Sequence, residues 1–139
     1  MSLAYLLDTN IVSEPLRPNP NRHTLDLLRQ TQHELAIASV VWHELLFGYE
    51  RLPESAKRKA IEAYLNEVVA PSLPVLPYDA RAASWHASER ARLTTTGKTP
   101  SFVDGQIAAI AAVNDLILVT ANVSDYASFE GLRIENWIS

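Results

Sequence analysis

Short apolar segments, each the length of a β-strand, alternate along the chain with segments of helical periodicity. Continuous apolar strands are typical of sheets buried on both faces, and helical connections between strands are typical of parallel pairing. The pattern therefore predicts an α/β fold, with a parallel sheet covered by helices on both faces and right-handed crossovers. The apolar segments are residues 3–7, 35–38, 73–76, 116–119 and 132–137, and the helical patterns fall at residues 22–32, 41–49, 55–69, 79–93 and 102–114.

Ser39 and Ser101 precede helical patterns and are expected to cap them, and Asp79 is expected to begin a third helix. The polar stretch at residues 94–98 is expected to be a loop, and a short turn is expected near Tyr126.

The chain has the length and composition of one globular domain, which we expect to span residues 1–139. It is 47% hydrophobic and 20% charged, and it has no internal repeat or interdomain linker. The absence of cysteine excludes disulfides, zinc-thiolate sites and thiol catalysis, and it suits the cytoplasm, where we expect the protein. The first apolar segment ends at Asp8 and has no basic flank, so it is interpreted as a strand and neither as a signal peptide nor as a membrane span.

The formal net charge of −4 is unusual for a protein that binds nucleic acid. The charge is unevenly distributed, since residues 17–98 hold 11 of the 12 Lys and Arg residues, whereas residues 99–139 hold five acids and one Arg. Acids that converge on divalent cations would account for this excess of negative charge. An acidic surface that maintains solubility accounts for it equally well, so charge alone leaves both interpretations open.

Several polar side chains lie where a parallel sheet carries its functional site, which is at the carboxyl ends of the strands. Two groups of them directly follow apolar segments, and two further acids belong to apolar helical patterns. The acids are Asp8, Glu44, Asp104 and Asp125, and Thr120 and Asn122 are polar neighbours of the last one.

Carboxylates in apolar surroundings are costly unless they are paired, protonated or bound to a metal, and several of them together repel one another. A divalent cation removes that repulsion. Mg²⁺ and Mn²⁺ prefer carboxylate oxygens, and they activate water for attack on a phosphodiester. The acids therefore indicate metal-dependent phosphodiester hydrolysis.

Each acid also has a purely structural interpretation. Asp104 lies three residues after Ser101, which fits a helix cap, and Asp8 could cap the helix that follows it. Glu44 could be a solvated residue on the flank of its helix, and Asp125 could be an ordinary turn residue. No single position decides between these interpretations.

Other catalytic classes fit the sequence less well. His86 and Glu89 are spaced for a surface ion pair, and no histidine is assigned a role. Neither a nucleophile elbow nor a Gly-rich phosphate loop is present. Asn10 stands where a dehalogenase-type phosphatase requires a second Asp, and residues 5–7 lack the acidic pair of a phosphorelay receiver.

Four motifs resemble those of the PIN-domain family, in particular its VapC and FitB toxins. They occur in the family order and span nearly the whole chain. The first is Leu-Leu-Asp-Thr-Asn-Ile-Val-Ser-Glu at residues 6–14, which continues at residues 15–18 in a way that is especially similar to FitB; the others are residues 39–49, 104–109 and 118–126, the last followed by Glu-Asn-Trp at residues 135–137.

The resemblance implies a PIN-like three-layer fold with a central five-stranded parallel sheet, and a homodimer. It implies a Mg²⁺- or Mn²⁺-dependent endoribonuclease, the toxin of a type II toxin-antitoxin system, that hydrolyses RNA, commonly tRNA. A cognate VapB- or FitA-like antitoxin would occupy the active-site groove, and the complex could also bind operator DNA. By the same resemblance the metal ligands are Asp8 and Asp104, with Glu44 as the third and Asp125 as the fourth, and Thr120 and Asn122 are candidates for positioning water or phosphate.

Two positions depart from the family pattern. Ala121 stands where family members often have Arg, which removes one candidate phosphate contact. Asn122 stands where they often have an acid, so either Asp125 completes the acidic site or the site holds one cation instead of two. The alternative function is a non-catalytic PIN-fold module that acts through an antitoxin and operator DNA.

Overall fold

The first strand of the chain lies at the centre of the sheet. In the computed structural model, which describes residues 2–138, β1 (Tyr5–Leu7) pairs in parallel with β2 (Leu35–Ala38) and with β4 (Ile117–Val119). β3 (Val75–Leu76) extends the sheet beyond β2, and β5 (Ile134–Glu135) extends it beyond β4. The strand order is β3-β2-β1-β4-β5 and every pair is parallel, which confirms the predicted fold class.

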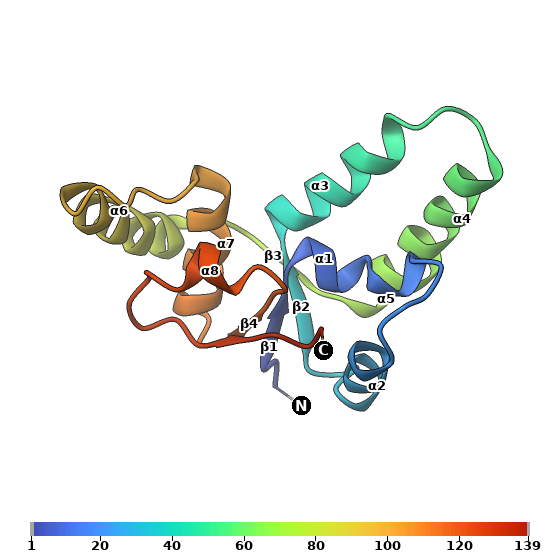
Figure 1. The fold of residues 1–139 in the computed structure, drawn as a ribbon, viewed down its shortest axis with the longest axis horizontal. Helices are drawn as coiled ribbons and strands as arrows, with labels where there is room; N and C mark the ends of the chain where they lie inside the picture. The colour runs from blue at the N-terminus through green and yellow to red at the C-terminus, as the bar shows by residue number, and fades with distance from the viewer. Residues whose placement is uncertain (1, 139) are drawn as a thin grey trace.

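Helices connect the strands and form the outer layers. They are α1 (Thr9–Val12), α2 (Arg22–Gln30), α3 (Ser39–Glu50), α4 (Ala56–Tyr64), α5 (Ala70–Ser72), α6 (Ala80–Thr95), α7 (Phe102–Val113) and α8 (Val123–Tyr126), with a 3-10 turn η1 (Glu14–Leu16) after α1 and a π-helical segment η2 (Leu65–Val69) between α4 and α5. Figure 1 shows α6, α7 and α8 on one side of the sheet and α1, α2, α4 and α5 on the other. α3 extends away from the sheet, and a loop at its far end leads back through α4 (Figure 1).

The predicted cap at Ser101 is confirmed, and Asp79, predicted to begin a helix, is the residue that caps it. Asp79 Oδ1 accepts a hydrogen bond from Ala82 N (3.0 Å), and Ser101 Oγ accepts one from Asp104 N (3.1 Å). The prediction for Ser39 is wrong, because β2 runs directly into α3 and Ser39 is already the first helical residue.

Three predicted boundaries also need correction. The helix predicted at residues 22–32 ends two residues early, where Thr31 turns the chain and its hydroxyl donates to Leu27 O (2.7 Å). The loop predicted at residues 94–98 begins two residues later, because α6 continues to Thr95. The turn expected near Tyr126 is the short helix α8, and the last strand covers only Ile134–Glu135.

α7 forms a large part of the core. Half of its residues are buried, where it packs against α6 and the sheet. The prediction of a surface ion pair between His86 and Glu89 is wrong, because α6 buries both side chains. His86 Nδ1 contacts the Tyr78 hydroxyl (2.8 Å), and Glu89 pairs with Arg92 (2.9 Å). None of the helices within residues 2–138 combines the length and the apolar character needed to cross a bilayer.

Candidate active site

Asp8 ends the central strand and begins the first helix. Its N–H donates to Val119 O (2.9 Å), which continues the pairing of β1 with β4. Its Oδ1 accepts from Thr9 N (2.8 Å), so Asp8 does cap α1. Its Oδ2 accepts from the hydroxyls of Thr120 (2.8 Å) and Tyr126 (3.3 Å). The capping role therefore uses only one of the two carboxylate oxygens.

The Tyr126 hydroxyl joins Asp8 to Asp104. Besides its contact with Asp8, it donates to Asp104 Oδ1 at 3.2 Å. Asp104 comes from the first turn of α7, and Tyr126 is the last residue of α8. Because a hydroxyl carries one proton, Tyr126 can donate to only one of the two carboxylates at a time. Sequence reasoning missed this residue, although a buried tyrosine needs a hydrogen-bond partner and two acids were expected nearby.

The electrostatics of the site disfavour ionisation of Asp104. Burial raises the pKa of Asp104 above its ordinary value, and the negative charges of Asp125 and Asp8 raise it further. Hydrogen bonds from Ser101 and Tyr126 act in the opposite direction. Burial and the neighbouring acids also raise the pKa of Tyr126, so its hydroxyl stays protonated.

Glu44 and Asp125 lie at the periphery of this pair. Glu44 Oε2 accepts from Thr9 Oγ1 (3.0 Å), which places the Glu44 carboxylate beside the start of α1. Asp125 is exposed on α8, yet it is close enough to Asp104 to raise the pKa of that carboxyl. In the part of the chain that the structure describes, no three Asp, Glu, His or Cys side chains are gathered into a complete metal cage.

The polar residues after β4 support Asp8. Thr120 is fully buried, and its Oγ1 donates to Asp8 Oδ2 while it accepts from Asn122 N (3.0 Å). Asn122 is exposed, and its side chain makes no hydrogen bond with the rest of residues 2–138. The following loop is held in place by Ala121 N, which donates to Asn10 Oδ1 (3.1 Å).

Comparison with known proteins assigns the chain to a family. The sequence model of the PIN domain matches residues 5–127, which is most of the chain. The chain belongs to the PIN-domain family. Toxin FitB of Neisseria gonorrhoeae is 29% identical to this PIN domain, over 95% of this chain and 97% of FitB. The tRNA(fMet)-specific endonuclease VapC of Shigella flexneri is 32% identical, over 97% of this chain and 98% of VapC.

A solved structure of FitAB bound to an IR36 DNA fragment superimposes on this PIN domain with a TM-score of 0.89. The two chains are 26% identical, and the match covers 97% of this chain and 96% of the other. The likeness therefore extends over nearly the whole fold.

The donor set of this PIN domain suits a hard divalent cation. Asp8 and Asp104 present carboxylate oxygens on either side of the Tyr126 hydroxyl, which can donate its proton to only one of them at a time. Mg²⁺ commonly binds through one or two carboxylates and completes its coordination with water and substrate phosphate. The lack of a complete cage among the described residues is therefore compatible with such an ion.

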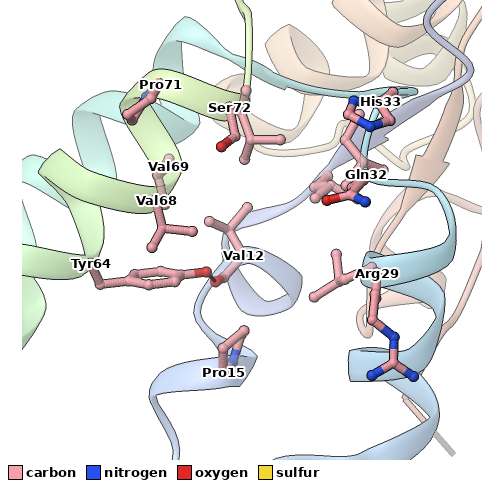
Figure 2. A pocket seen from close by; sticks show the side chains of 14 residues that line it. Val12, Pro15, Arg29, Gln32, His33, Tyr64, Val68, Val69, Pro71 and Ser72 are labelled. Carbon is pink, nitrogen blue, oxygen red and sulfur yellow. Dashed lines mark hydrogen bonds between the residues drawn. The ribbon is translucent and has the colours of Figure 1, made fainter.

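A cavity of about 560 Å³ lies elsewhere on this PIN domain, between α2 and the segment from α4 to α5 (Figure 2). Its lining is mostly apolar, and Tyr64 crosses it to donate to Val12 O (2.6 Å). None of the four candidate acids lines it. The size of this cavity therefore does not identify the catalytic site.

Proposed function

We propose that the chain is a metal-dependent endoribonuclease, the toxin of a type II toxin-antitoxin pair, which uses Mg²⁺ or Mn²⁺. The observation that carries the proposal is the meeting of Asp8 and Asp104 on one buried hydroxyl, in a PIN domain whose relatives include proteins named as ribonucleases. Two carboxylates that meet in this way offer the oxygen ligands that a divalent cation prefers.

Asp8 and Asp104 are the proposed metal ligands, with Glu44 and Asp125 as further acidic members of the site. A bound cation would supply the activation of water and the neutralisation of charge on the phosphate. Thr120 orients Asp8 through its hydroxyl, and it does not itself have to reach the substrate. Hydrolysis of this kind is expected to leave 5′-phosphate and 3′-hydroxyl ends.

Glu44 and Asp125 are suited to different tasks in this site. The Thr9 hydroxyl holds Glu44 close to the helix that Asp8 caps, so Glu44 can add charge beside the principal pair. Asp125 is exposed next to Asp104 and can contact incoming water or a second cation. The exposed side chain of Asn122, which lies beside this edge, is proposed to position phosphate or water.

The proposed substrate is RNA, and tRNA is the first class to examine because a relative is named as a tRNA(fMet)-specific endonuclease. The net charge of −4 disfavours a phosphate backbone in the absence of cations. Divalent cations in the acidic site would offset this charge where the RNA must approach.

The proposed partner is a cognate VapB- or FitA-like antitoxin that inhibits the enzyme in the cytoplasm. The support is the likeness to the toxin chain of FitAB, which was solved bound to DNA. We propose that this chain likewise forms a homodimer that joins its antitoxin on operator DNA.

Cleavage of a mixed RNA pool by antitoxin-free protein tests the catalytic proposal. We expect discrete cuts with Mg²⁺ or Mn²⁺, none with chelator, and none with Asp104→Asn. Asp115→Asn is the matched control, because Asp115 is exposed and its carboxylate forms a surface ion pair with Arg133. This substitution also removes one negative charge, but at a position outside the site, so cleavage should stay intact.

Thermal unfolding with and without Mn²⁺ distinguishes the proposed enzyme from the alternative, a non-catalytic binding module. A ligand that binds only the folded state raises its stability, so a metal enzyme should gain stability with Mn²⁺ concentration. Folded wild-type protein with neither cleavage nor this gain would contradict the enzyme and favour a non-catalytic binding module.

A further inference from the structure

Tyr126 occupies a position that its role in packing does not fully explain. The side chain is 1% exposed, and its ring lies 6.4 Å from that of Phe129. Packing would be satisfied equally well by phenylalanine, which differs only by the hydroxyl. That hydroxyl reaches two acids from different elements, Asp8 after β1 and Asp104 at the start of α7.

The two acids depend on Tyr126 to different degrees. Asp8 is held independently by Thr9 N at one oxygen and by the Thr120 hydroxyl at the other, both at 2.8 Å. The Asp104 carboxylate has hydrogen-bond support only from Ser101, of its own helix, and from Tyr126 within the described residues. Tyr126 is therefore the direct link that sets Asp104 relative to Asp8.

We infer that Tyr126 is a positioning residue of the metal site, whose hydroxyl holds Asp104 against Asp8 in the arrangement that binds the cation. The inference rests on the proposed function, since it concerns the same two acids. Hydrogen-bond partners behind metal ligands orient them, and their loss typically costs about 10- to 100-fold in metal affinity. Without the hydroxyl, Asp104 can turn away from Asp8, because like charges repel and nothing else among the described residues joins them.

The test is the affinity of Tyr126→Phe for Mn²⁺, measured by electron paramagnetic resonance of free Mn²⁺ or by calorimetry in the absence of RNA. We expect the Kd to rise about tenfold or more relative to wild type. Tyr64→Phe is the matched control, since it also removes a tyrosine hydroxyl that donates a hydrogen bond, but one that donates to Val12 O. The control should keep the wild-type Kd.

An unchanged Kd in folded Tyr126→Phe would overturn the inference. A tighter Kd would overturn it too, because it would mean that the hydroxyl competes with the cation. If wild-type protein itself fails to bind Mn²⁺, the proposed function fails, and that result is separate from a difference between the variants.

A second measurement on wild-type protein covers the case in which Tyr126→Phe does not fold. The Cζ resonance of ¹³C-labelled tyrosine reports the hydrogen bonding of each hydroxyl, and Mg²⁺ can be titrated without paramagnetic broadening. We expect the Tyr126 signal to shift with Mg²⁺ while the Tyr64 signal stays fixed. A Tyr126 signal that does not respond while Mg²⁺ binds would contradict the inference.

Discussion

Asp8 Oδ2 accepts hydrogen bonds from two hydroxyls, and the shorter of the two comes from Thr120. Thr120 is fully buried, so water cannot replace its hydroxyl without local rearrangement. The same Oγ1 accepts from the N–H of Asn122, which leads into α8. One hydroxyl thus connects the acid at the end of β1 to the helix that carries Tyr126.

Thr120→Val is expected to destabilise the protein by about 1–3 kcal/mol, because it leaves Asp8 Oδ2 with one donor fewer and Asn122 N without its acceptor. Thr120→Ser keeps the hydroxyl and should lose less stability than Thr120→Val. Urea unfolding of the two variants measures the difference. Equal stability of Thr120→Val and wild type would mean that the hydrogen bonds contribute nothing net.

At this scale the sequence predicted the acids but not the hydroxyl between them. Asp8 and Asp104 were singled out as polar residues in apolar surroundings, and the structure brings both to one hydroxyl. Their role as metal ligands stays a prediction. Tyr126 was not singled out because the direction of a side chain on a four-residue helix depends on tertiary packing, which no periodicity encodes.

Between elements, the packing of α6 against α7 depends on a histidine and a glycine. A Cβ at Gly105 would overlap the imidazole of His86, so α7 can approach α6 closely only with glycine there. His86 also packs against Phe102, with ring centroids 4.8 Å apart. Its buried Nε2 has no hydrogen-bond partner within residues 2–138. The imidazole therefore packs against Gly105, the residue that follows Asp104, and this environment disfavours a charge on the imidazole.

Folding stability is expected to decrease as the pH falls below about 6.5, the ordinary pKa of histidine. Burial lowers the pKa of His86, and the positive charge of Arg90 adds to the effect. The unfolded chain therefore takes up a proton at a higher pH than the folded chain, and acid favours unfolding.

Urea unfolding at several pH values between 5 and 7.5 measures this dependence. His86→Leu should flatten it, whereas His43→Leu, which changes an exposed histidine, should not. If the free energy of unfolding changes with pH equally in His86→Leu and wild type, the pH dependence comes from other groups.

The sequence predicted elements best where a local side-chain contact decides the boundary. Asp79 and Ser101 cap their helices through their own side chains; Ser101 was predicted as a cap and Asp79 as the start of its helix. Ser39 was misinterpreted because the same residue type also fits the first turn of a helix that continues directly from a strand. The final strand was predicted too long, since only Ile134 and Glu135 pair with β4.

In the molecule as a whole, alternation of strands and helices predicted the parallel sheet, but not its order. The order places the N-terminal β1 between β2 and β4, and so between segments that are far apart in the chain. Strand neighbours depend on which helices pack on which face, and this is a property of the complete fold.

A chain that stops at Asp115 lacks β4, β5 and α8 and is expected not to fold cooperatively. It would leave one edge of β1 unpaired and Asp8 without Thr120 and Tyr126. Far-UV circular dichroism through a urea titration checks this. A sigmoidal transition like that of the full chain would show that residues 2–115 fold by themselves.

The central position of β1 has a consequence for the order of events on the ribosome. Asp8 is synthesised well before its partners Asp104, Thr120 and Tyr126. A nascent chain therefore carries its first catalytic candidate long before it can assemble a site around it. A nuclease built in this way cannot complete its site, and so cannot cut RNA, until Tyr126 has been translated.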